Sequence, residues 1–124
     1  MHFAYWMILA AALLPYVMTG IAKSGGGIDN ASPRVGLDAL QGWRKRADWA
    51  QRNHFEAFPP FAAAVLVAEL AHAPQIRIDA LAALFVLLRV AYSGAYVGDH
   101  AMLRSGLWFG GIICVVALFC IGIG

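Results

Sequence analysis

The sequence has few charged side chains: 13% of its 124 residues are Asp, Glu, Lys or Arg, whereas 61% are hydrophobic. With a mean hydropathy of +0.69, the chain has too few polar groups to cover the surface of a soluble domain. The net charge of +2 is too small for a nucleic-acid surface, and no basic run alternates with aromatic residues. The composition therefore predicts a small integral membrane protein, a single domain over residues 1–124, with no nucleic-acid partner.

Cysteine is scarce as well. Cys114 and Cys120 lie six residues apart in the last apolar segment, and a helix would turn them to different sides, which disfavours a disulfide within that helix. Their spacing fits no metal site, and we expect no metal. The run Gly25–Gly27 follows no strand and precedes no Lys-Ser/Thr pair, so we interpret it as a linker and not as a phosphate-binding loop.

Long hydrophobic runs are present, and they predict an all-α fold, an integral membrane four-helix bundle. Residues 3–22 carry no charge, and a helix of that length spans about 30 Å, the hydrocarbon thickness of a bilayer. A cleaved signal peptide is the alternative for this segment, but neither basic residues before it nor a small-x-small cleavage site support one. The other spans are expected at about residues 55–72, 77–97 and 105–123.

The second helix is predicted to run from about residue 33 to 72, with Ser32 as its cap and Pro33 in its first turn. Its first half is amphipathic and should project from the membrane. The Pro59-Pro60 pair predicts a kink where the helix becomes apolar. Near its end, Glu69 and His72 are three residues apart, and we interpret them as an interfacial pair in preference to a proton relay.

Polar side chains are concentrated in residues 46–61, directly before that apolar half. On a helix, Arg46, Asn53 and Glu56 fall close to one face, and Arg52 is also four residues from Glu56. A solvated helix end with an ion pair would by itself explain this stretch. A second charged site further along the chain favours a functional interpretation.

That second site is Arg89, which follows the apolar run 80–88. A guanidinium there costs at least a few kcal/mol unless it is paired or hydrated, and it is too far from the loop at Gly98 to reach water comfortably. Tyr92 and Tyr96 share its helix face. Arg104 opens the last span, where a cation opposes the helix dipole, so stability alone does not account for it.

Basic residues collect in the loops after the first and third spans, which hold seven cations, whereas the other side has only Arg77. The seven are Lys23, Arg34, Arg44, Lys45, Arg46, Arg52 and Arg104. The positive-inside rule then predicts that both termini lie outside the cytoplasm. Both polar sites fall at the cytoplasmic end, where the cations favour an anionic ligand with more than one carboxylate and Glu56 favours an ammonium group on the same ligand.

The whole chain resembles the MAPEG family, the membrane-associated proteins in eicosanoid and glutathione metabolism, as a bacterial-type member. Three motifs carry the resemblance, in order and on the expected helices. They are Arg52-Asn53 with Glu56 and Pro60-Phe61, then Arg89 with Tyr92 and Tyr96, then Arg104.

The resemblance implies a homotrimer that binds glutathione as co-substrate between subunits. It also implies glutathione transferase or peroxidase activity on a lipophilic electrophile that arrives from the membrane lipids. Arg104 would stabilise the thiolate and is the implied catalytic residue. The residues implied to hold the tripeptide are Arg52, Asn53, Glu56, Arg89, Tyr92 and Tyr96.

The sequence departs from the family pattern in three places. Trp49 stands where some members carry a further arginine, Trp108 where several carry tyrosine, and the span from Tyr96 to Arg104 is one residue longer than in the closest eicosanoid enzymes. A membrane protein that keeps the fold without turnover is therefore the alternative function. A small multidrug transporter ranks last, because such proteins need an acidic residue in the first helix and residues 3–22 have none.

Overall fold

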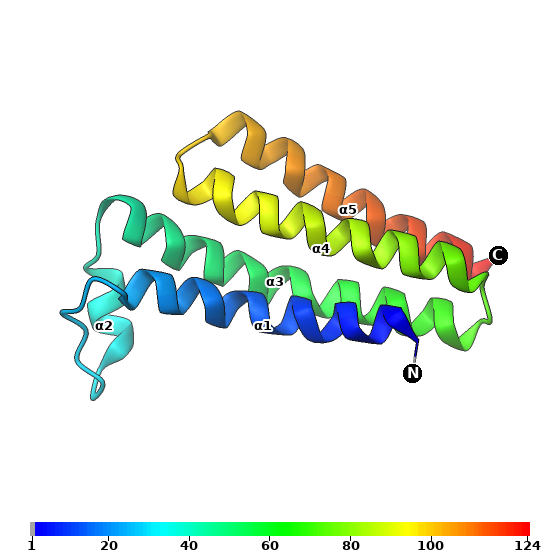
Figure 1. Cartoon of the computed structure of the whole chain (residues 1–124), viewed down its shortest axis with the longest axis horizontal. Helices are drawn as coiled ribbons and strands as arrows, with labels where there is room; N and C mark the ends of the chain where they lie inside the picture. Colours follow the sequence, from blue (N-terminus) through cyan, green and yellow to red (C-terminus); the bar gives the residue numbers. More distant parts are fainter. Residues whose placement is uncertain (1) are drawn as a thin grey trace.

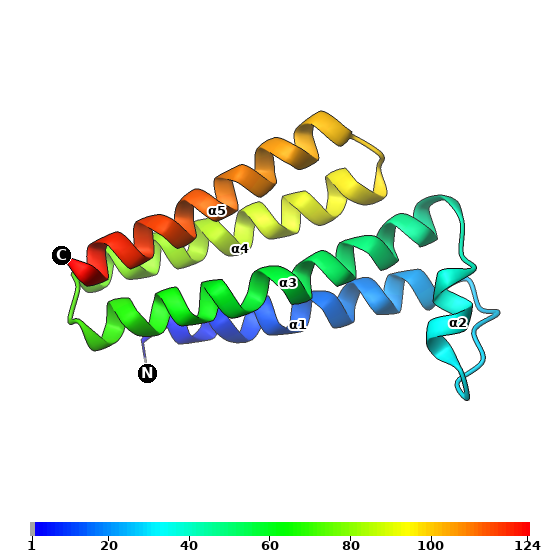
Figure 2. The ribbon, with the colours of Figure 1, turned by 180° about the vertical axis from the view of Figure 1, so that it is seen from behind.

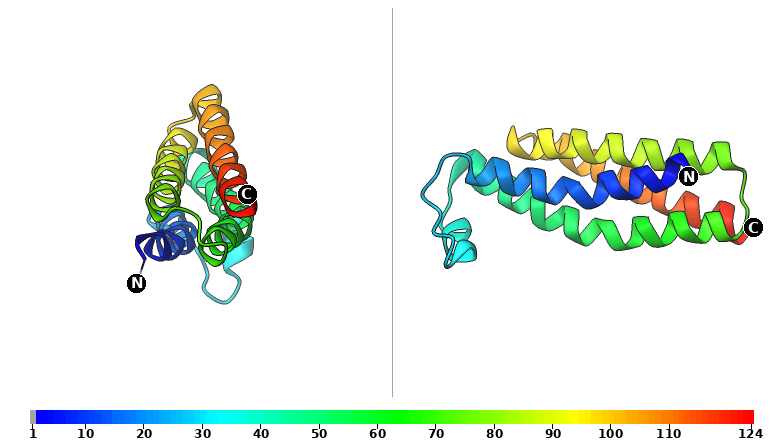
Figure 3. Two further views of the ribbon diagram at one scale, coloured as in Figure 1. Left: turned by 90° about the vertical axis from the view of Figure 1, so that its right-hand side faces the viewer. Right: turned by 60° about the horizontal axis from the view of Figure 1, so that its bottom comes forward.

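The computed structural model describes residues 2–124, and in this part of the chain it is all-α with five helices. Four long helices lie side by side, and a short one lies across one end (Figure 1). The helices are α1 (Phe3–Lys23), α2 (Pro33–Asp38), α3 (Gly42–Leu70), α4 (Gln75–Val97) and α5 (Ala101–Ile123). Both termini lie at the end opposite α2 (Figures 1 and 3).

The prediction of one continuous helix from residue 33 to 72 was wrong, because the chain turns between α2 and α3. Gln41 is extended, and Gly42 has a φ of +63°, a conformation that costs glycine no steric strain. The Lys45 ammonium fixes the turn by donating to the carbonyls of Leu37 and Asp38, at 3.1 Å each. This contact satisfies carbonyl groups that the end of a helix leaves unpaired.

α4 ends at residue 97, where the third span was expected to end, whereas α3 ends before the expected residue 72 and α5 begins before the expected residue 105. α3 ends at Leu70 and α4 at Val97, each through a Schellman motif whose left-handed residue is not glycine: His72 (φ 56°) and Asp99 (φ 63°). At the second turn, His100 N donates to Ala95 O at 2.8 Å and Asp99 N to Tyr96 O at 3.1 Å. The last loop is therefore short, and α5 begins at Ala101, so Arg104 lies within the helix and not at its start.

Three helices, α1, α4 and α5, are long and apolar enough to cross a membrane, with mean hydropathies of 1.6, 1.7 and 2.4. The fourth predicted span lies in α3. This helix is long enough to cross a membrane but is not apolar enough over that length, because its first half is charged. The apolar part of α3, residues 57–70, has a length of about 21 Å. It runs beside α1 for most of its length and continues as helix through Pro59 and Pro60 (Figure 2).

An apolar core holds the helices together near the termini. Phe61 of α3 stacks on Phe85 of α4, with ring centroids 4.0 Å apart and an interplanar angle of 7°. Small residues let the backbones approach: a Cβ added to Gly122 would lie 3.0 Å from the Ala68 Cα. Toward the other end, the α4–α5 pair diverges from the α1–α3 pair (Figures 1 and 2), and the polar residues lie there.

Candidate functional site

Arg89 is the centre of the polar end, with only 2% of its surface exposed. Its Nη2 donates to Asn53 Oδ1 at 2.7 Å, and its guanidinium approaches His54 Nδ1 at 3.2 Å from Nε and 2.8 Å from Nη2. The cost of burying this cation is offset by charge-assisted hydrogen bonds from α4 to α3. Arg89 and Asn53, predicted as site residues from separate motifs, are thus in direct contact.

His54 and Ser93 complete a closed circuit that the sequence did not reveal. Arginine can only donate, so His54 Nδ1 accepts, and its Nε2–H is left to donate to Ser93 Oγ at 2.6 Å. Ser93 Oγ in turn donates to the carbonyl oxygen of Arg89 at 3.0 Å. Two spacings in the sequence could have indicated these residues: His54 is next to Asn53, and Ser93 lies four residues after Arg89, on the same helix face.

Two tyrosines connect this circuit to Arg104. The Arg89 Cζ lies 4.2 Å from the centroid of the Tyr92 ring, and the Arg104 Cζ lies 4.6 Å from that of Tyr96. The two rings meet edge to face at 5.6 Å. Two cation–π contacts and one contact between rings therefore connect the buried Arg89 to the half-buried Arg104. The contact between Arg104 and Tyr96 joins α5 to α4.

Hollows adjoin this row of residues. Asn53 and Glu56 line both a cavity of about 170 Å³ and an open hollow of about 440 Å³. Tyr92 lines that hollow and another of about 280 Å³ on the side of Arg104. The shared residues show that the three spaces are neighbours. The larger hollow is lined by Trp49, Arg52, Asn53, Glu56, Tyr92 and Tyr96.

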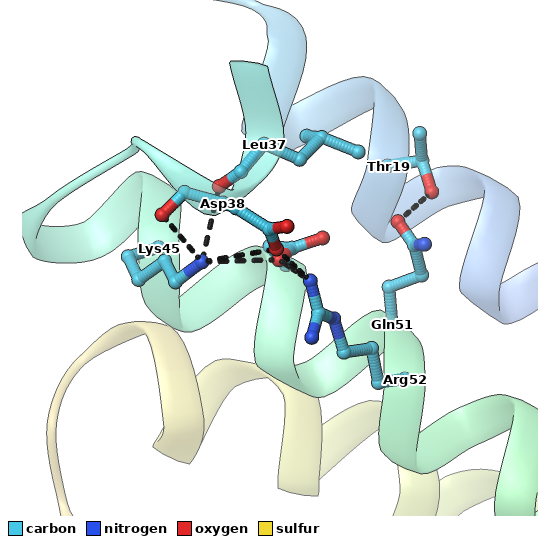
Figure 4. A network of polar contacts seen from close by, with 7 residues as sticks. Thr19, Leu37, Asp38, Lys45, Gln51 and Arg52 are labelled. Atoms are coloured by element: carbon cyan, nitrogen blue, oxygen red, sulfur yellow. Dashed lines mark hydrogen bonds and ion pairs between the residues drawn. The ribbon is translucent and has the colours of Figure 1, made fainter. Parts of the chain in front are cut away.

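Arg52 and Glu56 do not pair with each other, although their spacing allowed it. The Arg52 guanidinium pairs with Asp38 of α2 and, at 3.1 Å, with Asp48 one turn earlier in α3 (Figure 4). The hydrogen bond from Arg52 lowers the pKa of the Asp38 carboxyl below its ordinary value. Glu56 is exposed, and no cation of residues 2–124 lies within ion-pair distance of it. The predicted pair of Glu69 with His72 is also not formed, since Glu69 faces His2 at 3.8 Å and accepts from Gln75 Nε2 at 2.8 Å.

Both tryptophans that depart from the family pattern lie at the hollows. Trp49 packs against Tyr96 with ring centroids 6.4 Å apart and lines the hollow of about 440 Å³. Trp108 of α5 lines the cavity beside Arg89 and the hollow beside Arg104. The two residues therefore shape the spaces that a ligand would enter.

The seven site residues predicted from three separate motifs thus lie along one set of adjoining hollows. Comparison with curated proteins and with solved structures gave no match in either case. A family model described as "MAPEG family" matches residues 3–124, essentially the whole chain. With its apolar helices and this family match, the chain is an integral membrane protein that belongs to the MAPEG family.

Proposed function

We propose that this protein binds glutathione and uses it to conjugate lipophilic electrophiles or to reduce lipid hydroperoxides. One observation carries the proposal. Arg104 lies over the Tyr96 ring, at the rim of a hollow, and no carboxylate of residues 2–124 lies within ion-pair distance of it. A fixed cation without an anionic partner is available to stabilise an anion that a ligand brings.

The walls of the hollow offer the groups that glutathione needs. The tripeptide has two carboxylates and one ammonium group, and Arg52 and Glu56 present opposite charges on adjacent turns of α3. Charge-assisted hydrogen bonds of this kind hold a zwitterionic ligand in one orientation. Asn53, held by Arg89, and the Tyr92 and Tyr96 hydroxyls supply further polar groups. Arg89 itself acts from within the protein, because it is almost completely buried.

Arg104 would act on the sulfur. A thiol with a pKa of about 8.5 is mostly protonated at neutral pH, and a nearby cation favours the thiolate. In conjugation the thiolate sulfur bonds to the electrophilic carbon, and the leaving group departs with its electron pair. In peroxide reduction the thiolate attacks the terminal oxygen and an alcohol leaves; a second glutathione then yields the disulfide and water.

The electrophile would enter from the bilayer. Trp108 and Phe109 line the hollow beside Arg104, and Phe109 is 61% exposed on the outer face of α5. A lipophilic molecule can reach the sulfur across these apolar side chains, whereas glutathione enters from water at the charged wall of α3.

A homotrimer is part of the proposal. The hollow of about 440 Å³ is open on one side and Glu56 has no partner in the described chain, so a neighbouring subunit can complete the site. Native mass spectrometry in detergent should show three copies, and a monomer or dimer alone would contradict this assembly. We further propose that both termini face outward, which a C-terminal reporter active only in the cytoplasm would disprove.

A titration with glutathione tests the function. Purified protein should bind glutathione and its S-methyl analogue, while only glutathione should produce thiolate absorbance near neutral pH. Binding of both without thiolate absorbance would support the alternative of a binding protein without turnover, with Arg104 displaced from the sulfur by the altered loop. Binding of neither would exclude the proposed function and leave the alternative of a membrane protein that keeps the fold without turnover.

A further inference from the structure

The cavity of about 170 Å³ beside Arg89 lies between α3, α4 and α5, and most of its lining residues are apolar. Phe85, Arg89 and Gly111 are buried and form its floor. Pro60 of α3 and Ile112 of α5 are exposed and lie at its mouth. Both mouth residues belong to the apolar parts of their helices, so a molecule dissolved in the bilayer can reach the cavity between α3 and α5.

The floor of the cavity has room because residue 111 is glycine. One face of the Phe85 ring is covered by Phe61 in their parallel stack, and the remainder of the ring is available to the cavity. A Cβ added to Gly111 would lie 3.6 Å from Phe85 Cε2 and 3.9 Å from the Arg89 Cδ, which are ordinary contact distances. A methyl group at this position would therefore fit without a clash, but it would take space from the cavity.

The cavity is continuous with the proposed glutathione site. Asn53 and Glu56 line both the cavity and the hollow of about 440 Å³. Trp108 lines both the cavity and the hollow beside Arg104. A molecule that enters from the bilayer thus has its inner end close to the place proposed for the sulfur of glutathione.

The volume of the cavity limits what it can hold. An engineered apolar cavity of about 150 Å³ in another protein binds benzene. A space of about 170 Å³ therefore accommodates one six-membered ring with small substituents, and it has no room for a long acyl chain. Phe85 and Trp108 favour an electron-poor ring, because the face of an aromatic side chain is negative.

We propose that this cavity, formed within one subunit, is the electrophile subsite, and that Gly111 sets its size limit at a single aromatic ring. The inference rests on the proposed glutathione function and narrows its substrate class. The ring lies against Phe85 and Trp108, with the carbon that carries the leaving group turned toward Arg104. The thiol proton goes to water when the thiolate forms. The sulfur then bonds to that carbon, and the leaving group departs with the electron pair of its broken bond.

An inert probe tests the cavity apart from glutathione. Fluorobenzene does not react with thiols, and its binding to protein in detergent can be followed by fluorine NMR without glutathione. Gly111→Ala should weaken binding by about fivefold or more, because its methyl group fills part of the cavity. Gly106→Ala makes the same change in the same helix, where an added Cβ meets nothing within 4 Å, and should bind as the wild type does. Equal binding by all three proteins would overturn the proposal, even if the wild type conjugates electrophiles.

A second pair of variants opens the cavity and does not fill it. Ile112→Ala shortens a side chain at the mouth and should strengthen binding of a two-ring probe, fluoronaphthalene, several-fold relative to fluorobenzene. Ile113→Ala is the matched control, since Ile113 is 66% exposed and lines none of the spaces described above, and it should leave this preference unchanged. Both side chains are exposed, so neither substitution threatens the fold. The same preference in both variants would contradict the position of the site.

Turnover connects the cavity to the chemistry. Gly111→Ala should raise the KM for chlorodinitrobenzene by about fivefold and leave the KM for glutathione unchanged. A wild type that turns over a long-chain lipid hydroperoxide more efficiently than chlorodinitrobenzene would overturn the size limit. If the wild type binds fluorobenzene in the cavity but does not bind glutathione, the proposed function fails by itself, and the role of the cavity as an electrophile subsite is overturned with it.

Discussion

The two ends of the helix assembly are stabilised in different ways. At the end with the termini, apolar rings and small residues fill the space between helices, as in the Phe61–Phe85 stack. At the other end, α4 and α5 diverge from α1 and α3, and buried polar side chains join α4 to α3 beside a smaller apolar cluster. The apolar packing at the first end supplies most of its helix contacts. The polar end can therefore keep hollows and unpaired groups, which a ligand site needs.

Within the polar end, Arg89 and Arg104 differ in burial and in the number of partners that the protein gives them. Arg89 is 2% exposed and its donors are occupied by Asn53 and His54. Arg104 is half-buried, its guanidinium lies over the Tyr96 ring, and no carboxylate of residues 2–124 lies within ion-pair distance of it. An arginine whose hydrogen bonds are made inside the protein maintains structure, and one without partners is available for chemistry. The predictions below test this division.

The largest effect on stability is expected from Phe61→Ala at the apolar end. Phe61 is completely buried in the stack with Phe85, and loss of a core phenylalanine costs about 3–5 kcal/mol. The unfolding temperature in detergent should fall sharply, whereas Phe109→Ala, at a side chain that is 61% exposed, should change it little. Equal losses in the two variants would contradict the proposed core.

Arg89→Ala should reduce both stability and glutathione binding. The substitution leaves Asn53 Oδ1 and His54 Nδ1 buried without a donor, at a cost of about 2–5 kcal/mol. Arg77→Ala, at an exposed cation near the start of α4, is the control and should be close to neutral. Affinity and unfolding temperature must be measured together, and a stable Arg89→Ala protein with normal affinity would contradict the division between the two arginines.

Arg104→Ala should leave stability and glutathione affinity nearly unchanged and abolish turnover. Loss of one group that stabilises a developing anion lowers kcat by about 100-fold or more. Thiolate absorbance of bound glutathione should disappear in the same variant. If turnover falls only because affinity falls, Arg104 is a binding residue and its proposed role is wrong.

Much of this arrangement could be predicted because hydrophobic runs and helical spacing are local properties. Residues 3–22 gave nearly the full extent of α1, and the spacing of Arg89, Tyr92 and Tyr96 placed them on one face of α4. The turns after α3 and α4 were expected, but the end of α3 and the start of α5 were displaced by a few residues, because His72 and Asp99 adopt the left-handed conformation usually signalled by glycine. Contacts between helices were missed for another reason: spacing allowed Arg52 to meet Glu56, but it could not show that Asp38 of α2 lies beside Arg52.

The smallest effect concerns pH and the attachment of α2. The hydrogen bond from Arg52 lowers the pKa of Asp38 below its ordinary 3.8, against desolvation, which raises it. Because the pKa is lower in the folded state, this carboxylate contributes stability above pH 3.8, and the contribution is lost as the pH falls through the folded-state pKa. Wild type should therefore unfold at a slightly higher temperature than Asp38→Asn at pH 6, and the difference should shrink progressively as the pH falls below 3.8.

A double-mutant comparison assigns that pH dependence to the pair. In an Arg52→Gln background the main cause of the lowered Asp38 pKa is gone, so Asp38→Asn should make almost no further difference at any of these pH values. Side chains as exposed as these, 62% for Asp38 and 51% for Arg52, are screened by water and salt, so the effect should shrink further at high ionic strength. A difference that does not shrink as the pH falls below 3.8, or that persists in the Arg52→Gln background, would mean that Asp38 holds α2 through the backbone of the turn and not through its charge.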